Sequence, residues 1–310
     1  MNATRLGIGV IGAGRVGAVL GAALRAQGHG ITGAYAVSDQ SRARAADLLP
    51  GVPLLDVPSI VERSEMLLLA VPDDELPGLA AGIAATGLVP GGQLVVHTCG
   101  RHGIDVLRPL AQAGCATLAL HPAMTFTGTR ADLPRLVGCP IAITAEEPFP
   151  TVAAALVTEL DGIPVPIAEG DRILYHAALA HAANHLVVLV DQARDALSRI
   201  GIENPGEYLR PLLEAALDES LRRGAGALTG PVRRGDAGTV SAHLDALADL
   251  DTTAVRDDQG DLAEVYRALA RAAVRRAGLA PERAAAVLDV LQDSGESAAP
   301  SDPADPAEDS

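Results

Sequence analysis

The feature that most constrains this chain is a glycine-rich turn between two regular patterns. Residues 6–11 form a short apolar run, which is typical of a buried parallel strand. A helical period of apolar residues runs from 15 to 27 and ends at Gly28. The turn between them reads Gly12-Ala13-Gly14-Arg15-Val16-Gly17. A strand, a G-x-G-x-x-G turn and a helix in this order predict a dinucleotide-binding unit.

Each glycine of the turn has a physical reason. Gly12 permits the tight turn, Gly14 lets a pyrophosphate approach the backbone, and Gly17 allows the helix to pack closely on the strand. The anion then lies at the helix amino terminus, where free N–H groups and the helix dipole favour negative charge. The alternative is a glycine-rich turn that binds no ligand.

The pattern of strand, helix and strand repeats along the first half of the chain. Further apolar runs predict strands at 31–37, 65–71, 93–98, 115–120 and 140–144, with helices between most of them. The pattern fades near Pro164-Val165-Pro166, and beyond it the periodicity predicts helices at 169–200, 206–223, 236–250, 259–278 and 281–293. We therefore predict an α/β fold, a doubly wound and mostly parallel Rossmann sheet followed by an all-α domain.

The predicted domains are a dinucleotide-binding Rossmann domain over 1–167, a helical substrate and dimerisation domain over 168–293, and a disordered acidic tail over 294–310. The chain has 310 residues, of which 48% are hydrophobic and 20% charged, so two domains with sizeable cores are expected. All basic residues are arginine; without lysine, a lysine base or Schiff base is excluded.

The formal net charge of −15 argues against binding to nucleic acid, which requires a basic surface. The three cysteines are spaced neither for a zinc site nor for a disulfide framework, and the chain begins without a signal-peptide pattern. We expect a cytoplasmic protein. The apolar segment 173–190 contains three histidines and an asparagine, so we expect a buried helix there and no membrane span.

The residues after the second predicted strand bear on the choice of cofactor. An NAD enzyme commonly has an acidic residue about 20 positions after the glycines, and Asp39 lies slightly late for that role. Ser38, Ser41 and Arg42, with Arg44 behind them, are suited to bind a 2′-phosphate. The alternatives are a helix N-cap for the serines and solvated positions for the arginines. We favour NADP over NAD.

Several residues end the predicted strands at the edge of the sheet where ligands bind in open α/β folds. Val71 and Pro72 end one strand and should border the cofactor; the alternative is a plain turn that ends the strand. Thr98 ends the next and is positioned to hydrogen-bond substrate or ribose. His121 closes the strand over 115–120 and should point towards the nicotinamide; histidine is the usual acid or base near neutral pH. The alternative for His121 is a buried histidine that bonds only to backbone.

The long helix after 169 carries a second polar set. His176 and Asn184 lie eight positions apart, so both can face one cleft; the alternative is a polar contact buried at a dimer interface. His181 and His185 have a metal-compatible spacing, but no third ligand has a convincing position, and we predict no metal site. We expect these two histidines on an interface or in the core.

Two residues between later helices are suited to bind a substrate carboxylate. Thr229 offers a hydroxyl and Arg234 a bidentate guanidinium, whereas the alternative for Arg234 is an interdomain salt bridge. Asp236 is the expected N-cap of the next helix.

The order of motifs resembles a family of bacterial Rossmann-like proteins with a helical carboxyl-terminal domain of unknown function. The family is distantly related to 6-phosphogluconate dehydrogenase, pyrroline-5-carboxylate reductase and the deazaflavin-dependent NADP reductases. Besides the glycine turn, the motifs that carry the resemblance are Ala70-Val71-Pro72-Asp73-Asp74, Val96-His97-Thr98-Cys99-Gly100, Leu120-His121-Pro122-Ala123-Met124-Thr125-Phe126, Leu174-Tyr175-His176-Ala177-Ala178 with Asn184, and Ala227-Leu228-Thr229-Gly230-Pro231-Val232 with Arg234-Gly235-Asp236.

The resemblance implies an NADP-linked oxidoreductase whose helical domain forms a homodimer and closes the active site, with Thr125 among the substrate-binding residues. It also implies ketopantoate as a substrate, because similar proteins are often encoded beside pantothenate-synthesis enzymes. The His-Pro pair at His121 is similar to that of prephenate dehydrogenases, where the histidine contacts the reacting oxygen. Related dehydrogenases have a lysine on the long helix; here His176 is the natural substitute.

We therefore expect hydride transfer from NADPH to a small carboxylated keto or imino compound in the interdomain cleft. In this hypothesis His121 or His176 supplies the proton, while Asn184 and Thr98 orient the acceptor. A dinucleotide-binding sensor without turnover is the alternative, since a fold alone does not specify function. A deazaflavin-linked reductase is a third possibility.

Overall fold

The computed structural model describes residues 5–252 and 261–292. The chain divides into two compact units, Met1–Leu186 and Val187–Ser310, and each is considered by itself. This division lies inside helix α8 (Arg172–Arg199), whereas the sequence pattern suggested a boundary near 167, ahead of that helix. The expected acidic tail over 294–310 lies outside the described residues.

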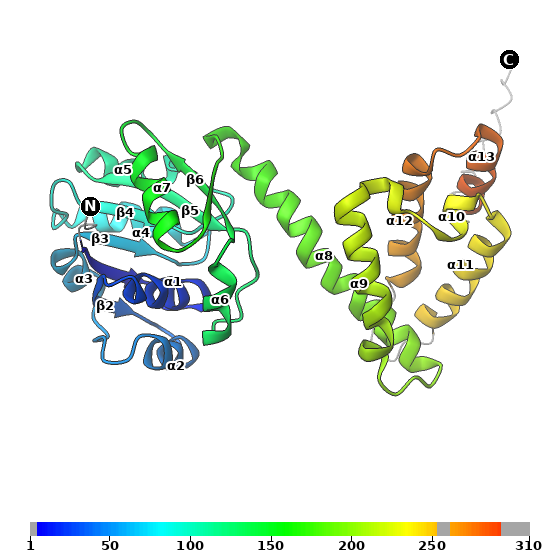
Figure 1. Cartoon of the computed structure of the whole chain (residues 1–310), viewed down its shortest axis with the longest axis horizontal. Coiled ribbons are helices and arrows are strands. Elements are labelled where there is room, and N and C mark those ends of the chain that lie inside the picture. Colours follow the sequence, from blue (N-terminus) through cyan, green and yellow to red (C-terminus); the bar gives the residue numbers. More distant parts are fainter. Residues whose placement is uncertain (1–4, 253–260, 293–310) are drawn as a thin grey trace, which may run out of the picture. The chain divides into compact units, whose positions relative to one another are not determined.

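The first unit is built on a seven-stranded sheet with the order β2-β1-β3-β4-β5-β6-β7 (Figure 1). Its strands are β1 (Gly7–Ile11), β2 (Gly30–Tyr35), β3 (Met66–Leu69), β4 (Leu94–His97), β5 (Ala116–Pro122), β6 (Pro140–Ala145) and β7 (Ile163–Pro166). Its helices are α1 (Arg15–Ala26), α2 (Asp39–Leu48), α3 (Val57–Arg63), α4 (Leu76–Ala85), α5 (Arg108–Gln112), α6 (Leu133–Leu136) and α7 (Pro150–Glu159), with short 3-10 helices at Asp105–Leu107, Arg130–Asp132 and Glu169–Asp171.

The strand order reverses direction at β1. The chain passes from β1 outward to β2 and then crosses to β3 on the other side of β1. All pairs from β2 to β5 are parallel, so their carboxyl ends share one edge. In open α/β sheets the ligand crevice lies at such a reversal, here between the ends of β1 and β3. The predicted Rossmann sheet is confirmed.

The far side of the sheet departs from the parallel pattern. Strand β6 runs antiparallel to β5, with Pro122 opposite Ile141, and the N–H of Ala123 donates to the carbonyl of Pro140 at 2.9 Å. The segment 123–139 therefore leaves and returns at the same edge. Beyond β6 we expected the strand pattern to end near Pro164, but β7 pairs with β6 in parallel. Prolines are tolerated there because β7 is an edge strand.

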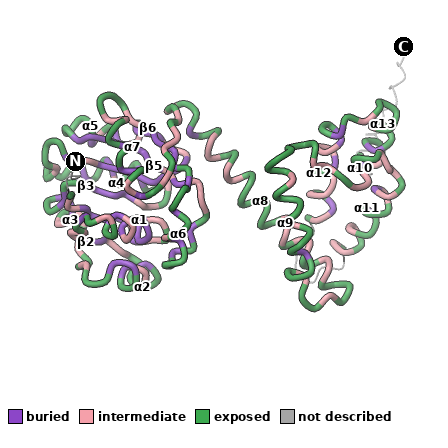
Figure 2. Tube along the Cα trace, viewed as in Figure 1, coloured by how far each residue is buried: buried purple, intermediate pink, exposed green. Residues whose placement is uncertain are grey.

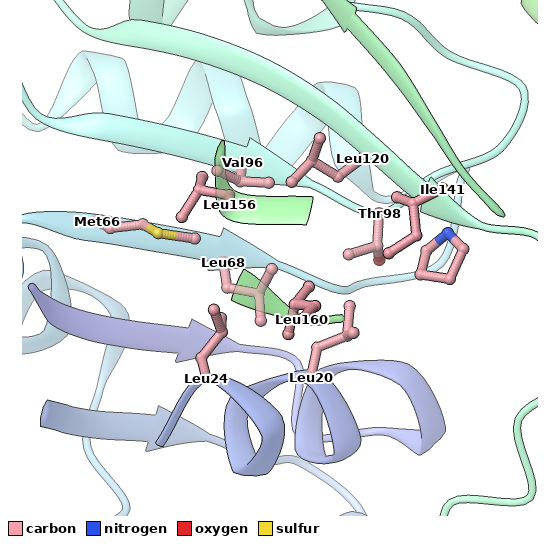
Figure 3. A pocket seen from close by; sticks show the side chains of 11 residues that line it. Leu20, Leu24, Met66, Leu68, Val96, Thr98, Leu120, Ile141, Leu156 and Leu160 are labelled. Atoms are coloured by element: carbon pink, nitrogen blue, oxygen red, sulfur yellow. The ribbon is translucent and has the colours of Figure 1, made fainter. Parts of the chain in front are cut away.

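Two apolar cores cover the two faces of the sheet, and the buried positions of the unit gather along the strands (Figure 2). One core packs α1, α2 and α7 against the sheet, and the other packs α3, α4 and α5. Inside the first core a cavity of about 20 Å³ is lined almost entirely by apolar side chains from α1, the strands and α7 (Figure 3). A space of that size holds one water at most.

The second unit is helical. Besides the end of α8 it contains α9 (Pro205–Arg223), α10 (Gly230–Arg234), α11 (Ala237–Thr252), α12 (Leu262–Ala277) and α13 (Pro281–Val290), with a 3-10 turn at Gly224–Ala227. Helices α11, α12 and α13 share a small core. The segment before Asp236, expected to be a break, contains the short helix α10. Asp236 caps α11 as predicted, accepting from the Thr239 N–H at 3.1 Å.

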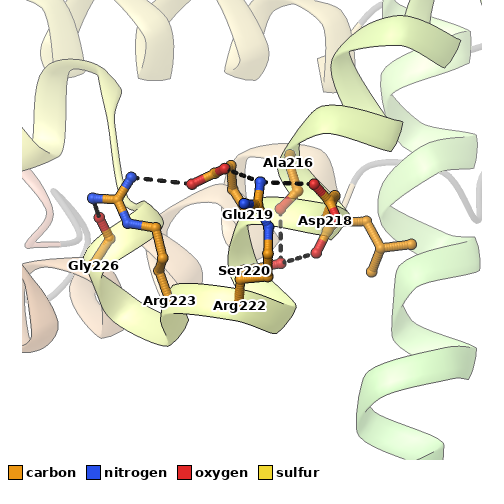
Figure 4. Close-up of polar contacts among 8 residues, drawn as sticks. Ala216, Asp218, Glu219, Ser220, Arg222, Arg223 and Gly226 are labelled. Atoms are coloured by element: carbon orange, nitrogen blue, oxygen red, sulfur yellow. Dashed lines mark hydrogen bonds and ion pairs between the residues drawn. The ribbon is translucent and has the colours of Figure 1, made fainter.

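The end of α9 is held by charges and backbone bonds on its surface (Figure 4). Arg222 pairs with Asp218 at 2.8 Å and with Glu219, and Arg223 pairs with Glu219 at 3.0 Å and donates to the Gly226 carbonyl at 3.1 Å. Exposed pairs of this kind contribute only about 0.3–0.5 kcal/mol each. These interactions therefore mark the end of α9 and contribute little to the stability of the helical unit.

Helix α8 differs from its expectation. We predicted a buried helix, but Arg172 is its only buried residue, and Ile173 and Leu174 are 74% and 73% exposed. The tube along α8 is mostly coloured as exposed or intermediate (Figure 2). Within the described residues it is the one helix long and apolar enough to cross a membrane. Length and composition alone are weak grounds for a membrane span, and the helix carries three histidines and an asparagine, which are costly in lipid.

Candidate functional site

The glycine turn lies at the reversal of strand order. Gly12 has a φ of 99°, and a side chain there would collide with the carbonyl of Ala70 at the end of β3. A side chain at Gly17 would collide with the carbonyl of Gly12, whereas the space beside Gly14 is open. No side chain caps the amino terminus of α1. The N–H groups of Gly12 and Ala13 donate to the Tyr35 carbonyl, at 3.1 and 3.0 Å. The amino terminus of α1, uncapped and next to open space at Gly14, is the arrangement that binds a pyrophosphate.

The serines chosen for a 2′-phosphate are engaged locally. Ser38 is the N-cap of α2, accepting from the Ser41 N–H at 3.1 Å, and the Ser41 hydroxyl donates to the Ser38 carbonyl at 2.8 Å. Arg42 is exposed. Arg44 is half-buried and lies with Arg15 against the loop at Gly128; a Cβ on that glycine would be 2.8 Å from the Arg44 Nε and 3.0 Å from the Arg15 Cγ. The Arg44 guanidinium and the stem of Arg15, a residue of the glycine turn, thus meet at Gly128.

The other residues expected near the cofactor and substrate are spread along the same edge. Val71 is half-buried and Pro72 exposed, directly after β3. Thr125 is exposed in the segment 123–139. Thr98 is buried, and its side chain lines the small apolar cavity (Figure 3). An interior position does not suit the substrate contact expected of Thr98.

The carboxyl end of β5 carries a histidine–tyrosine pair. The Nδ1 atom of His121 lies 2.9 Å from the hydroxyl of Tyr175 on α8, and the same hydroxyl lies 3.4 Å from the carbonyl of His121. The rings meet edge to face, with centroids 5.6 Å apart. Burial lowers the pKa of His121 to about 4, assisted by the nearby charges of His176 and Arg172. His121 is therefore a neutral imidazole at neutral pH.

Gly100 allows two imidazoles to approach one backbone position. A Cβ at Gly100 would lie 2.6 Å from the Cδ2 of His176 and 2.9 Å from the Nε2 of His121. The centroids of the two rings are 5.8 Å apart. The structure therefore brings together His121 and His176, which the sequence analysis named separately, on the space that Gly100 leaves empty.

His97 fixes the loop that presents Gly100. Its Nε2 lies 2.7 Å from the Gly103 carbonyl, and its Nδ1 accepts from the Cys99 N–H at 3.1 Å. These partners define a neutral ring with the proton on Nε2, and burial lowers the pKa of His97 to about 4. Burial also raises the pKa of the Cys99 thiol to about 12, so Cys99 is not a nucleophile.

Arg172, the first residue of α8, lies completely buried behind the pair. Its Nε donates to the Thr144 hydroxyl at 2.8 Å, and one terminal nitrogen donates to the Ala119 carbonyl at 3.0 Å. Its other terminal nitrogen, NH1, has no hydrogen-bond partner in the part of the chain that the structure describes. The guanidinium carbon lies 6.0 Å from the centre of the Tyr175 ring. A buried positive charge thus adjoins the histidine–tyrosine pair.

The other polar residues that the sequence pointed to on α8 are exposed. Asn184 lies on the surface, and His181 and His185 face each other with their Nδ1 atoms 2.9 Å apart. A core position does not suit these two exposed histidines, and an interface position stays a prediction. Among residues 5–252 and 261–292, no group of three or more metal-ligating side chains comes together.

Thr229 and Arg234 belong to the helical unit, and both are exposed. Thr229 borders a mainly apolar pocket of about 390 Å³ within that unit, lined also by His243 and Tyr266. The His243 Nδ1 lies 2.9 Å from the Tyr266 hydroxyl. The helical unit therefore has a histidine–tyrosine pair of its own.

Sequence reasoning did not single out Tyr175, Arg172 or Gly100 as site residues. Tyr175 stands 54 positions from His121, so nothing local indicates their hydrogen bond. Arg172 looked like one of many arginines at the start of a helix, and only its burial distinguishes it. A signal did exist for Gly100, because it directly follows a predicted strand at the ligand-binding edge.

Comparison with protein families agrees with the two-part organisation. Residues 1–122 match a model described as a Rossmann-like domain, and residues 139–273 match a domain of unknown function designated DUF2520. The resemblance to Rossmann-like proteins with a helical carboxyl-terminal domain of unknown function is confirmed. None of the curated proteins compared matches this sequence.

Solved structures share the fold at low sequence identity. A candidate NADP oxidoreductase from Bacteroides fragilis is 20% identical with a TM-score of 0.73, covering 87% of this chain and 98% of that one. A protein from Thermotoga maritima is 18% identical with a TM-score of 0.60, over 87% and 98%. An imine reductase from Myxococcus stipitatus, solved in complex with NADP⁺, is 20% identical with a TM-score of 0.57, over 87% and 94%.

Proposed function

We propose that this chain, which joins a Rossmann-like domain to a DUF2520 domain, is an NADP-dependent oxidoreductase that delivers hydride to a small carboxylated keto or imino compound. The observation that carries the proposal is the shared edge of the sheet. The glycine turn after β1 and the His121–Tyr175 pair after β5 both lie at the carboxyl ends of the parallel strands. A cofactor and a proton-handling pair belong at that edge in a dehydrogenase.

The residues present fit a dinucleotide. Gly14 leaves open space at an uncapped helix amino terminus, where the pyrophosphate would lie. When bound, NADPH supplies hydride to an electrophilic carbon. The solved neighbours include an NADP⁺ complex of an imine reductase, which is in keeping with this cofactor.

The preference for NADP rests on Arg44 and Arg15 more than on Arg42. The guanidinium of Arg44 and the side-chain stem of Arg15 lie beside Gly128, and Ser38 caps the amino terminus of α2 at the same edge. A charged hydrogen bond to a phosphate contributes about 1.5–3 kcal/mol. Arg44→Ala should therefore weaken NADPH binding by roughly 10-fold or more, while NADH binding and an Arg42→Ala control change little.

The acceptor would lie against the two imidazoles at Gly100. His121 contacts the reacting oxygen or nitrogen through Nε2, and His176 lies on the other side of the same space. The buried cation Arg172 adjoins the cluster and favours an acceptor with a carboxylate. Ketopantoate is the first acceptor to test. Asn184, Thr125, Thr229 and Arg234 remain further candidates for substrate contact.

The decisive experiment is calorimetric titration with NADPH and, separately, NADH, followed by spectrophotometric assay of NADPH oxidation at 340 nm. The acceptors would be ketopantoate, other 2-oxo acids and cyclic imines. Binding of NADPH with turnover of one acceptor class would support the proposal. Binding of both cofactors without turnover would favour a dinucleotide sensor, unless added deazaflavin restored turnover. Failure to bind either cofactor would reject both functions.

We also propose that a second copy of the chain covers the apolar surface of the helical unit. Several large apolar side chains on α9 are exposed, among them Leu212 at 65% and Leu221 at 79%. Light scattering after gel filtration should show a dimer that Leu212→Glu dissociates. A cytoplasmic location suits the three buried, free cysteines.

A further inference from the structure

The proton that the proposed reduction requires has no obvious source in His121 alone. At neutral pH the ring is uncharged, because burial lowers its pKa to about 4. A neutral imidazole gives up its N–H only when its other nitrogen receives a proton at the same time. The hydroxyl that lies 2.9 Å from the Nδ1 of His121 belongs to Tyr175.

Tyr175 keeps its proton in the resting protein. Burial raises the pKa of its phenol, and the nearby guanidinium of Arg172 acts in the opposite direction. The hydroxyl has two acceptors on the same residue, the Nδ1 of His121 at 2.9 Å and the carbonyl at 3.4 Å. Donation to Nδ1 is the shorter bond, and it leaves the ring proton on Nε2, next to the space at Gly100.

Arg172 supplies the charge that such a phenol needs. The guanidinium is completely buried, and among the described residues Glu169 acts on it only at a distance, without an ion pair. Its NH1 has no hydrogen-bond partner there. Burying an unpaired charge is costly, and an arginine does not lose its proton to avoid the cost. Its hydrogen bonds to Thr144 and Ala119 explain where the side chain lies. They do not explain why a positively charged side chain occupies this buried position.

A negative charge that forms next to Arg172 only during turnover would offset the free-energy cost of burying its guanidinium. A phenolate on Tyr175 would form beside the guanidinium, whose carbon lies 6.0 Å from the ring centre. Opposite charges at this range favour the charged form of an acid. The missing partner of Arg172 is then not a side chain of the resting protein but an ion that the reaction creates.

We propose that Tyr175, His121 and Arg172 form a proton relay in which Tyr175 is the proton source and Arg172 stabilises the phenolate left behind. The proposal rests on the function proposed above. As the acceptor carbon gains hydride, its carbonyl oxygen becomes an alkoxide and takes the proton from the Nε2 of His121. In the same step the N–H bond at Nε2 breaks and the Tyr175 O–H proton passes to Nδ1. His121 stays neutral throughout, and Tyr175 becomes a phenolate.

The relay is reset by solvent. Tyr175 is half-buried, so a water molecule reprotonates the phenolate and leaves hydroxide in solution. The restored hydroxyl donates to the carbonyl of His121 while Nδ1 keeps its proton, and a change of tautomer returns the proton to Nε2. The two acceptors around the Tyr175 hydroxyl therefore serve the two states of the ring.

The first test needs no substrate. The chain has four tyrosines and no tryptophan, so phenolate formation can be followed by absorbance at 295 nm. Subtracting the titration of Tyr175→Phe isolates Tyr175. Its apparent pKa should rise by about 1 unit or more in Arg172→Met, and Arg172→Lys should restore most of the difference. Thr144→Val removes a bond to Arg172 but keeps the charge, so the titration of Tyr175 should be unchanged.

The second test is kinetic. Tyr175→Phe should lower kcat by roughly 100-fold with NADPH affinity unchanged, whereas Tyr266→Phe should leave kcat as it is. In a plot of kcat against the fraction of D2O in the solvent, the parent should give a curve, because two protons move. Tyr175→Phe should give a straight line.

The outcomes separate the relay from the function on which it rests. Full kcat in Tyr175→Phe, or an unchanged titration of Tyr175 in Arg172→Met, would overturn the relay while leaving the reductase in place. If no acceptor is reduced at all, the proposed function fails, and the titration still decides whether Arg172 stabilises a Tyr175 phenolate. If Arg172→Met does not fold, Arg172→Gln decides that point, because it also removes the charge and should likewise raise the apparent pKa of Tyr175.

Discussion

The two histidine–tyrosine pairs of this molecule have nearly the same geometry and very different surroundings. In both, the Nδ1–hydroxyl distance is 2.9 Å, and the ring centroids are 5.6 Å apart at His121–Tyr175 and 5.8 Å apart at His243–Tyr266. Burial raises the pKa of both phenols. The geometry of a histidine–tyrosine pair is therefore not sufficient to identify a proton relay.

What separates the pairs is their environment. His121 lies at the carboxyl edge of the sheet beside the buried Arg172, which helps to keep its pKa near 4. His243 is an exposed residue at the rim of an apolar pocket in the helical unit. A buried charge and a position at the ligand edge give the first pair a chemical use. The second pair is its internal control.

The largest expected effect comes from removing one imidazole from each pair. His121→Asn should lower kcat by roughly 10²–10⁴-fold, the usual contribution of a group that transfers a proton in the transition state. His243→Asn should change kcat less than about 2-fold, because that ring only borders a pocket of the helical unit. Steady-state assays with calorimetric NADPH titrations would check both. Equal losses would show that the two pairs do not differ in function.

Acid should weaken the sheet unit through its buried histidines. The folded-state pKa values of His97 and His121 are both about 4, below the unfolded value near 6.5, so the unfolded chain binds more protons between these limits. Their contribution to stability is full above about pH 6.5 and is lost as the pH falls towards 4. For the fully buried His97 the loss is on the order of 2 kcal/mol by pH 4.5.

Hydrogen exchange of peptides from β4 and β5, corrected for intrinsic rates, would measure this loss. His121→Asn should reduce the fall in protection between pH 6.5 and 4.5, and His243→Asn should not. Protection that stays constant across this range would contradict the neutral assignment of both buried rings.

A smaller effect should follow from displacing the first pair without removing it. A Cβ at Gly100 would lie 2.9 Å from the Nε2 of His121, so Gly100→Ala must shift the ring. We expect kcat to fall by about 10-fold, since misplacement of a reacting group by a fraction of an ångström is costly. Gly82→Ala on α4, where no atom lies within 4 Å, is the matched control and should leave kcat unchanged. A normal kcat in Gly100→Ala would place the acceptor elsewhere.

The smallest effect is expected at the second pair. Tyr266→Phe removes one hydrogen bond to His243 and should lower the unfolding free energy of the helical unit by about 0.5–1.5 kcal/mol. Urea unfolding, monitored by the hydrogen exchange of peptides from α12, would measure this loss of unfolding free energy. A larger loss than that of Tyr175→Phe in its own unit would reverse the comparison between the pairs.

Features encoded locally could be predicted from the sequence, whereas features made by tertiary contact could not. The turn from Gly12 to Gly17 was predictable because strand, glycine spacing and helix follow each other within one segment. Strand β7 was missed because Pro164 and Pro166 argue against a strand unless it is known to be at an edge. The exposure of α8 was missed because apolar composition alone does not tell which partner covers a helix.

The site shows the same division. The sequence identified His121 and His176 from their places at the end of a strand and on a helix. It did not indicate that Tyr175 lies within hydrogen-bonding distance of His121, or that Arg172 lies buried behind them without an ion pair to any described residue. Both facts depend on the packing of α8 against β5 and β6. Thr98 was a reasonable choice at a strand end, but its side chain points into the core (Figure 3).

The antiparallel pairing of β5 with β6 has an evolutionary consequence. Because β6 runs back along β5, the segment 123–139 begins and ends at the ligand-binding edge. A backbone hydrogen bond between Ala123 and Pro140 holds its two ends together. A buried carboxylate, Asp132, anchors its middle by accepting from the Gly128 N–H at 2.8 Å. Insertions or exchanges between these anchors would remodel the rim of the site while every strand kept its register. Recombination within the segment 123–139 can therefore give related proteins a new substrate specificity without any change in the sheet.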